Sequence, residues 1–134
     1  MPRTSRVAPG GYVYHVLNRG VGRRRLFDKA ADFQAFEDIL AETCRLLPMR
    51  VCGFCLMPNH WRLFLSPRED PDLSEFTGWV TLTHTQRWHA NRHSAGTGHL
   101  FQGRFKTFPV QGDEQYDMVC RYLSGMHCGR IWLP

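Results

Sequence analysis

The chain has 134 residues, 43% of them hydrophobic and 13% aromatic, and its 17 lysines and arginines exceed its 12 aspartates and glutamates. This size and composition predict a single globular domain over residues 1–134, with its core at about 11–124, and they exclude a low-complexity or disordered chain. The net charge of +5 and the sequence pI near 9.2 favour a polyanionic partner such as nucleic acid.

The N-terminal region and the cysteines bear on where the protein resides. Residues 1–5 are basic and polar with no apolar run behind them, and no stretch approaches the roughly 18 apolar residues that cross a membrane. The odd number of cysteines, five, predicts free thiols in a reducing compartment, so we expect a cytoplasmic protein. Cys52 and Cys55 have a zinc-like spacing. Residues three apart on a strand face opposite sides, however, so we expect two small buried side chains.

The first predicted element is a strand over Gly11–Asn18, which is rich in β-branched and aromatic residues. A basic loop punctuated by glycine follows over Arg19–Arg25. Asp28 is expected to cap a helix that runs to about Leu47, where Pro48 ends it. The apolar stripe of this helix repeats at steps of three or four residues and comprises Phe33, Phe36, Leu40, Cys44 and Leu47.

Two strands joined by a tight turn come next, over Met49–Met57 and His60–Ser66. Apolar residues alternate along the second of them, which predicts a half-buried strand. Side chains two apart on a strand share a face, so His60 and Arg62 should project together while Trp61 faces the other way. Such a pair could hold a metal or a phosphate, and a histidine at position 62 would make a two-histidine metal site.

A second helix is predicted from Asp70 to about His93, then a strand over Arg104–Gln111, and a last helix from Asp113 to about Ser124. The order predicts an α+β, ferredoxin-like split βαβ fold. This is a four-stranded antiparallel sheet with helices on one face and an added C-terminal helix. On that last helix Tyr122 lies off the apolar stripe and is free for other work. The inward residues of the second helix are expected to be Phe76, Trp79, Val80 and Thr83.

The histidines outside the third strand are predicted to have structural or solvated positions. His84, His89 and His93 on the second helix are expected on a solvated basic face. His15 is expected in the core, although its strand should neighbour that of His60 and would let the two rings approach. His99 is interpreted as structural.

Several separated segments of this sequence occur together in one known family. The most specific are Met-Pro-Asn-His at a strand start and, some forty residues later, Gly-His-Leu-x-Gln-Gly-Arg-Phe. In order and spacing these segments resemble the REP-associated tyrosine transposases, a branch of the HUH transposases of single-stranded DNA. The resemblance covers about residues 11–123 and is carried by Tyr14–Gly20, Phe27-Asp28, Met57–Leu63, Asn91-Arg92, Gly98–Lys106 and Arg121–Leu123.

The resemblance implies a protein that binds single-stranded or hairpin DNA and cuts it. In the family, two histidines flanking a bulky residue hold a divalent cation, Mg²⁺ or Mn²⁺. A tyrosine on the terminal helix attacks the phosphorus and leaves a 5′-phosphotyrosine. Carried over, His60 is the first metal ligand, Trp61 the bulky residue and Tyr122 the nucleophile. Arg62 departs from the pattern, because arginine does not coordinate a cation, although its planar fork can bind a phosphate.

The C-terminal segment departs from the family as well. One helical turn after the tyrosine, where related enzymes can place a polar metal ligand, stands Met126, with His127 as a substitute one residue further. These departures support an alternative hypothesis, in which the protein is a catalytically impaired or domesticated module of the same fold that binds hairpin DNA. A generic ferredoxin-like RNA-binding domain is a third hypothesis, and it would make the placement of His60 and Tyr122 a coincidence.

Basic and aromatic side chains supply the predicted contacts to DNA. Trp61, Trp88 and Phe101 are available either for base stacking or for the core. The resemblance implies a monomer rather than a homodimer, and no membrane partner is expected. The predicted DNA-binding residues are Arg19, Arg23, Arg24, Arg25, Asn59, Arg62, Arg104 and Lys106.

Overall fold

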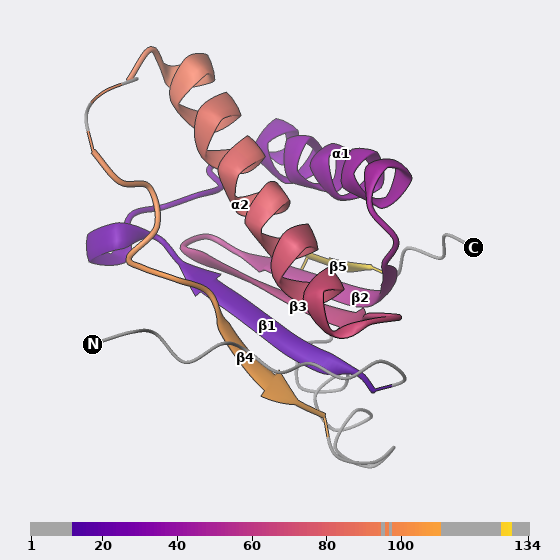
Figure 1. Ribbon diagram of the computed structural model, residues 1–134. Helices are drawn as coiled ribbons and strands as arrows, with labels where there is room; N and C mark the ends of the chain where they lie inside the picture. The colour runs from indigo at the N-terminus through magenta and orange to yellow at the C-terminus, as the bar shows by residue number, and fades with distance from the viewer. Residues whose placement is uncertain (1–11, 95, 97, 111–126, 130–134) are drawn as a thin grey trace.

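The computed structural model describes residues 12–94, 96, 98–110 and 127–129 (Figure 1). The helix predicted from Asp113 to Ser124, with Tyr122, lies outside these residues. In chain order the elements are β1 (Tyr14–Arg19), the short 3-10 helix η1 (Val21–Arg23), α1 (Ala30–Leu46), β2 (Arg50–Met57), β3 (His60–Ser66), α2 (Asp70–Arg92), β4 (Lys106–Pro109) and β5 (His127–Gly129).

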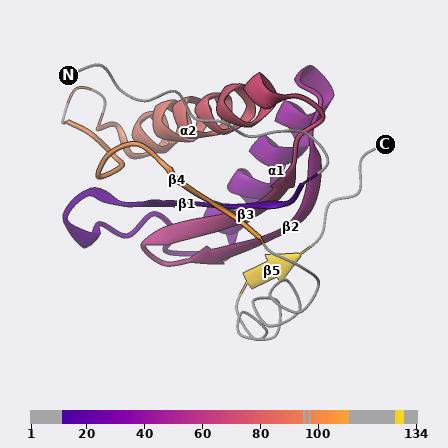
Figure 2. The same ribbon diagram turned by 60° about the horizontal axis from the view of Figure 1, so that its bottom comes forward.

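The strands form one antiparallel sheet in the order β4-β1-β3-β2-β5. Both α-helices cover the same face of this sheet, as the two views show (Figures 1 and 2). The predicted ferredoxin-like α+β arrangement of four antiparallel strands with helices on one face is therefore confirmed. The fifth strand, β5, was not predicted. It adds three residues to the sheet beside β2.

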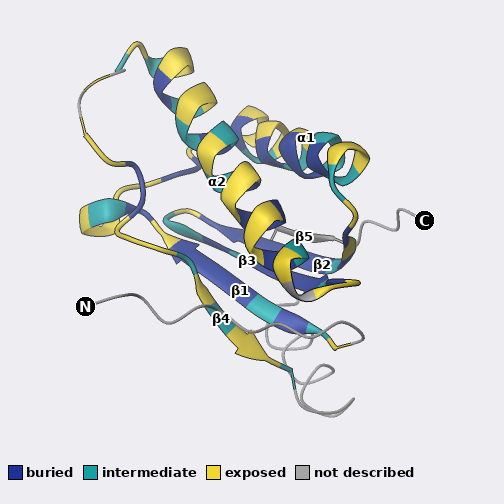
Figure 3. Ribbon diagram, in the orientation of Figure 1, coloured by how far each residue is buried: buried dark blue, intermediate teal, exposed yellow. Residues whose placement is uncertain are grey.

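The hydrophobic core lies between the helices and the sheet (Figure 3). Trp61, Leu63 and Leu65 are fully buried there, because alternate side chains of β3 point toward the helices. The intervening residues of β3 point to the other face, which we call the second face of the sheet. Phe64 is buried there in a separate small cluster. The predicted alternation of β3 is confirmed over its whole length.

The helices pack by apolar stripes, with two differences from the expected positions. The N-cap of α1 is Lys29 rather than Asp28, and the carboxylate of Asp32 accepts the backbone N–H of both residues, at 3.2 and 2.8 Å. On α2, Phe76 and Val80 are buried as expected, but Trp79 is 47% exposed, so its inward placement was wrong. No helix in the described part of the chain is both long and apolar enough to cross a membrane.

A β-bulge changes the expected geometry of the cysteines on β2. The register shifts between Val51 and Gly53, so Cys52 is the extra residue of the strand. Cys52 and Cys55 consequently pack into the same cluster on the second face. The expectation that these two residues face opposite sides was wrong, because a bulge shifts the two-residue period of a strand by one.

Cys55 is disulfide-bonded, which corrects the expectation of free thiols throughout the chain. In the β2–β5 register the residue opposite Cys55 is Cys128. Cys44 has a free thiol, and burial raises its pKa to about 11.

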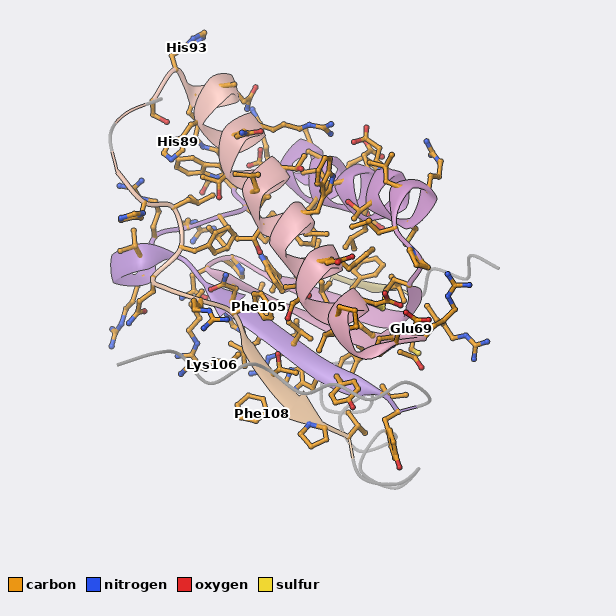
Figure 4. The ribbon with its side chains drawn as sticks, in the orientation of Figure 1. Glu69, His89, His93, Phe105, Lys106 and Phe108 are labelled. Atoms are coloured by element: carbon orange, nitrogen blue, oxygen red, sulfur yellow. The ribbon has the colours of Figure 1, made fainter. Side chains whose placement is uncertain are left out.

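Of the three histidines predicted on the second helix, two are buried rather than solvated. The ring of His84 stacks on Phe27 with a centroid distance of 5.6 Å and meets Phe36 edge-on at 4.9 Å. His89 is also buried, with Nδ1 2.8 Å from the hydroxyl of Ser94. The prediction of a solvated basic face was therefore wrong for these two residues. It holds for His93, which is exposed at the end of the helix (Figure 4).

The neutral ring of His84 is expected to make the fold acid-sensitive. Burial and the positive charge of Arg92 lower its pKa from 6.5 to about 3, although the negative charge of Asp32 acts in the opposite direction. Below pH 6.5 this histidine becomes protonated in the unfolded chain but stays neutral in the folded chain, so the free energy of unfolding decreases as the pH falls. Between pH 7 and pH 5 this loss amounts to about 2 kcal/mol. Urea unfolding of wild type and His84→Phe at both pH values measures it.

The His84→Phe variant should lose this part of the pH dependence. A His99→Gln variant, in which an exposed histidine is removed, should keep it. An equal pH dependence in wild type and His84→Phe would contradict the assignment of a neutral buried ring.

Candidate nucleic-acid interface

The turn between β2 and β3 is held in place by the end of β1 and the loop that follows. The carbonyl of Pro58 accepts the backbone N–H of Leu26 at 2.6 Å, and the carbonyl of Asn59 accepts that of Gly20 at 2.9 Å. Gly20 has no room for a side chain, because an added Cβ would lie 2.3 Å from the carbonyl oxygen of Arg24. The first residue of β3 therefore has a fixed position relative to β1.

The ring of His60 is oriented by its neighbour. Its Nδ1 lies 2.8 Å from the side-chain oxygen Oδ1 of Asn59, which can only accept, so Nδ1 carries the proton. The unprotonated Nε2 is buried and has no hydrogen-bond partner. His60 thus presents a lone pair at Nε2, as a metal-ligating histidine with a second hydrogen-bonded nitrogen does.

The strand register surrounds His60 with positive charge. Arg19 on β1 lies directly opposite His60, and Arg62 follows two positions along β3, opposite Leu17. Burial lowers the pKa of His60, and the charges of Arg62 and Arg19 lower it further. The Nε atom of Arg62 is itself buried without a hydrogen-bond partner. On the opposite side of His60 from β1, the residue paired with it is Met57 on β2.

These residues do not fit a divalent cation. His60 offers one imidazole nitrogen, but its neighbours are two guanidinium groups and a thioether, and no carboxylate or second imidazole joins it in the register. Among the described residues, no group of three histidine, cysteine, aspartate or glutamate side chains could hold a metal ion. Two arginines around a histidine fit an anion such as a phosphate instead.

A second basic group lies on the other side of β1, where β4 begins. Lys106 lies opposite Leu17, and Figure 4 shows it at the start of β4. The segment before β4 is tied to β1 because the N–H of Gln102 donates to the carbonyl of Arg19 at 2.9 Å and Phe101 bridges to Gly20. A cavity of about 160 Å³ lies between these segments. Its lining comprises Leu17, Asn18, Arg19, Gln102, Gly103, Arg104 and Lys106.

Not all predicted DNA-binding residues gather at this end of the sheet. Arg24 lies over the ring of Trp88 at 5.6 Å, and Arg25 pairs with Asp28 at 2.9 Å, so both lean toward the helices. Arg23 is exposed on η1. The residues that the structure brings together are Arg19, Asn59, His60, Arg62, Arg104 and Lys106.

Arg92, which belongs to the family-like segments, has a structural role. Its guanidinium lies over the ring of Trp88 at 4.1 Å and contacts the carboxylate of Asp32 at 3.3 Å. The indole of Trp88 in turn donates to the carbonyl of Leu26 at 3.1 Å. These contacts fasten the end of α2 to the start of α1.

Trp61, Phe101 and His15 lie apart from His60. Trp61 and Phe101 are buried in the core, so neither presents a face for base stacking. His15 is opposite Phe64, four residues along β3 from His60, and stacks on it at 5.1 Å. Burial and the charge of Arg62 lower its pKa to about 4. His127 lies opposite Leu56 in the β2–β5 register, and Tyr122 is outside the described residues.

Asn18 and Gln102 line the cavity but were not predicted as functional residues. Asn18 stands inside a strand that was assigned on its apolar pattern, and Gln102 inside a segment noted for its basic residues. Their residue type was a signal, because Asn and Gln side chains can hydrogen-bond to nucleic acids. Only the pairing of residues 101 and 102 with the end of β1 puts both residues on the lining of one cavity.

Comparison with known proteins places this geometry in a family. The model of a family described as transposase IS200-like matches residues 10–125. The fold resembles that of a REP-associated tyrosine transposase bound to a REP hairpin, with a TM-score of 0.70 and 18% identity, covering 92% of this chain and 70% of that one. It also resembles a candidate transposase from Deinococcus radiodurans R1, with a TM-score of 0.63 and 13% identity, covering 90% and 95% of the two chains. No curated protein matches the sequence.

Proposed function

The chain belongs to the IS200-like transposase family, and on that premise we propose that it binds single-stranded or hairpin DNA where β1, β3 and β4 meet. The observation that supports this most directly is the convergence of Arg19, Arg62 and Lys106, which the register places on three neighbouring strands. Basic side chains in such an array neutralise successive phosphates of a strand. The structural relative whose hairpin complex is known has the same fold.

Arg62 is the residue that we propose as the central phosphate contact. Its guanidinium can donate two parallel hydrogen bonds to a phosphate, and its Nε has no other partner. His60 lies beside it with its ring fixed by Asn59. A phosphate bound here would give the buried N–H at Nε of Arg62 an acceptor, which favours binding of the anion, whereas the unprotonated Nε2 of His60 is itself an acceptor and gains no bond from it.

Strand cleavage by Tyr122 is the second candidate function. It is supported by the family match, which extends to residue 125 and so includes the tyrosine. In a complete site, a divalent cation polarises the scissile phosphate. The residues around His60 do not fit such a cation, so we propose that metal-supported cleavage is impaired in this protein and that DNA binding is its retained activity.

Binding to a DNA hairpin with a single-stranded extension is expected to depend on both salt and position. Fluorescence anisotropy between about 50 and 200 mM salt should show a steep loss of affinity. Arg19→Ala and Arg62→Ala should each cost about 1.5–3 kcal/mol and reduce the salt slope by roughly 0.7–0.9, because each removes one charged phosphate contact.

The control is Arg45→Ala, which removes an equal charge from the exposed end of α1. This variant should keep nearly the wild-type affinity. An equal loss in all three variants would mean that net charge alone attracts the DNA, and binding that ignores salt would contradict the proposal outright.

A further inference from the structure

We propose that α2 carries a contact surface for a second copy of this chain, which docks its own α2 against it in the antiparallel direction. The surface lies on the side of the helix turned away from the sheet, where exposed residues follow one another along α2 (Figure 3). We call it the outer face of α2. It comprises Ser74, Glu75, Gly78, Trp79, Leu82 and Gln86. The inference does not depend on the proposed function, because the two surfaces share no residue.

The outer face of α2 is unusually apolar for the solvent side of a helix. Such a side ordinarily carries charged and polar residues, yet no charged residue occurs between Glu75 and Arg87, a stretch of three helical turns. Trp79 and Leu82, which are 47% and 55% exposed, lie three residues apart and are therefore neighbours on the helix surface. A contiguous apolar patch with a polar rim is typical of a contact between proteins.

Gly78 is an independent sign of a partner on this face. Glycine in a helix interior is destabilising relative to other residues, and Gly78 stands well inside the 23-residue helix α2. The packing of a single copy does not require it, because a Cβ added at this position would meet no atom within 4 Å. The distance between packed helices depends on the side chains at their contact. A missing side chain here therefore favours the close approach of another helix.

The order of charges along α2 favours a second copy of the same helix as the occupant. Glu75 and Arg87, both exposed, stand at the two ends of the uncharged stretch. A two-fold axis beside Thr81, the midpoint of this stretch, brings Glu75 of each copy toward Arg87 of the other. The same axis sets Trp79 of each copy against Leu82 of the other. The outer face is therefore complementary to itself, as a two-fold contact requires, and antiparallel helices also oppose their macrodipoles favourably.

The size of the outer face predicts a weak dimer. Three helical turns span roughly 16 Å, so each copy buries less than the about 800 Å² of a standard interface. The charged ends set the direction of docking more than its strength, because Arg87 already contacts Glu42 at 2.7 Å and both side chains are about half exposed. We expect a Kd on the order of 100 µM. At about 1 µM the protein is then the monomer that the family resemblance implies, and unfolding of Trp79→Ala at this concentration reports on the monomer.

Sedimentation equilibrium from about 1 to about 500 µM measures the association. Wild type should show a monomer–dimer equilibrium without larger species, because a two-fold contact closes on itself. Leu82→Ala should weaken dimerisation at least about tenfold, because it removes an apolar contact twice in each dimer. Leu46→Ala is the matched control. It removes the same side chain, 62% exposed, from the end of α1 and should leave the equilibrium unchanged.

Gly78→Gln separates the dimer contact from the stability of the fold. In the monomer the new side chain has free space and a better helix propensity, so the melting temperature at about 1 µM should rise by a few degrees. In the dimer the side chain would stand between the two helices, so association should fall at least about tenfold. Misfolding would lower both quantities and cannot produce this combination.

Cysteine substitutions test the antiparallel direction. A protein with both Glu75→Cys and Gln86→Cys should form a covalent dimer under mild oxidation, because the axis places position 75 of one copy opposite position 86 of the other. Within one helix these positions are roughly 16 Å apart, too far for an internal disulfide. Glu75→Cys alone should form little covalent dimer, because its two copies lie at opposite ends of the contact. The native cysteines are the same in both proteins.

Each result bears on the dimer separately from DNA binding. A wild type that stays monomeric up to about 500 µM would overturn the dimer, as would equal effects of Leu82→Ala and Leu46→Ala or unchanged association of Gly78→Gln. Stronger cross-linking by Glu75→Cys alone would overturn the antiparallel direction. Leu82→Ala should bind hairpin DNA with the wild-type affinity, so a failure of the proposed DNA binding and a failure of the dimer are observed in different measurements.

Discussion

Arg62→His is expected to give the protein cleavage of hairpin DNA that depends on Mn²⁺ or Mg²⁺. His60 and position 62 project from the same face of β3, and Nε2 of His60 already presents an unpaired lone pair. A second imidazole two residues away would replace the positive charge that now opposes a cation. A bound metal ion contributes several kcal/mol to such a reaction, so the yield of adduct should rise at least about a hundredfold.

The measurement is the formation of a covalent protein–DNA adduct that survives denaturation, with labelled hairpin DNA as substrate. Wild type should give at most about one hundredth of the adduct that Arg62→His gives, and the adduct of Arg62→His should disappear when the metal is chelated. The same variant should bind DNA more weakly without metal, because it lacks the guanidinium. Arg45→His serves as the control and should remain inactive.

A second variant tests whether Tyr122 is the nucleophile in this reaction. Arg62→His combined with Tyr122→Phe should give no adduct. An adduct in that double variant would show that another residue attacks the phosphorus. A folded Arg62→His protein that gains a metal ion but no adduct would show that position 62 is not the residue that limits cleavage.

Trp61→Ala is expected to cost about 3–5 kcal/mol of folding free energy, the largest stability effect of any single tryptophan in the described part of the chain. Trp61 is fully buried between Phe36, with a ring-centroid distance of 5.7 Å, and Phe101, at 6.0 Å. Its truncation leaves a cavity at the point where β3, α1 and the segment before β4 meet. Urea unfolding at constant pH measures the loss.

Trp79→Ala is the matched control, because the same side chain is 47% exposed on α2. Its effect should stay within about 0.5 kcal/mol. Trp61→Phe should cost less than Trp61→Ala, because it keeps a ring and removes an indole N–H that has no partner. Equal losses for the two alanine variants would contradict the central place of Trp61 in the core.

The parts of the fold that were predicted correctly depend on regular periods. The alternation of polar and apolar residues in His60–Ser66 predicts a strand with one buried face, so both the bounds of β3 and the direction of its side chains were predicted. The helices were located by their apolar stripes and by the prolines at their ends. The family resemblance covers the same residues as these periods, so both predict the same fold.

The errors arise where a tertiary contact outweighs the local pattern. His84 and His89 are polar by type, yet both are buried, His84 between Phe27 and Phe36 and His89 beside Ser94. Trp79 is apolar by type and lies outside, because the buried stripe passes through Leu73, Phe76 and Val80. No sequence pattern predicts the bulge at Cys52, which places Cys52 on the same face of the sheet as Cys55.

The candidate site was predicted only in part for a similar reason. Asn59, His60 and Arg62 lie within one short segment, so sequence reasoning could place them together. The run of arginines that follows β1 looked equally suitable, but Arg24 and Arg25 bond to Trp88 and Asp28 near the helices. The cavity needs the pairing of β1 with β4, two strands that are far apart in the sequence, and no local pattern reports it.

The pairing of β1 with β4 determines when the proposed interface can form during synthesis of the chain. The proposed interface combines residues 17–19, 60–62 and 102–106, so none of its surfaces is complete until the segment before β4 has left the ribosome. Contacts of such large sequence separation form late and slowly during folding. A nascent or truncated chain that ends before residue 100 therefore holds three of the five described strands and only part of the cavity lining, and the proposed interface is complete only in the finished protein.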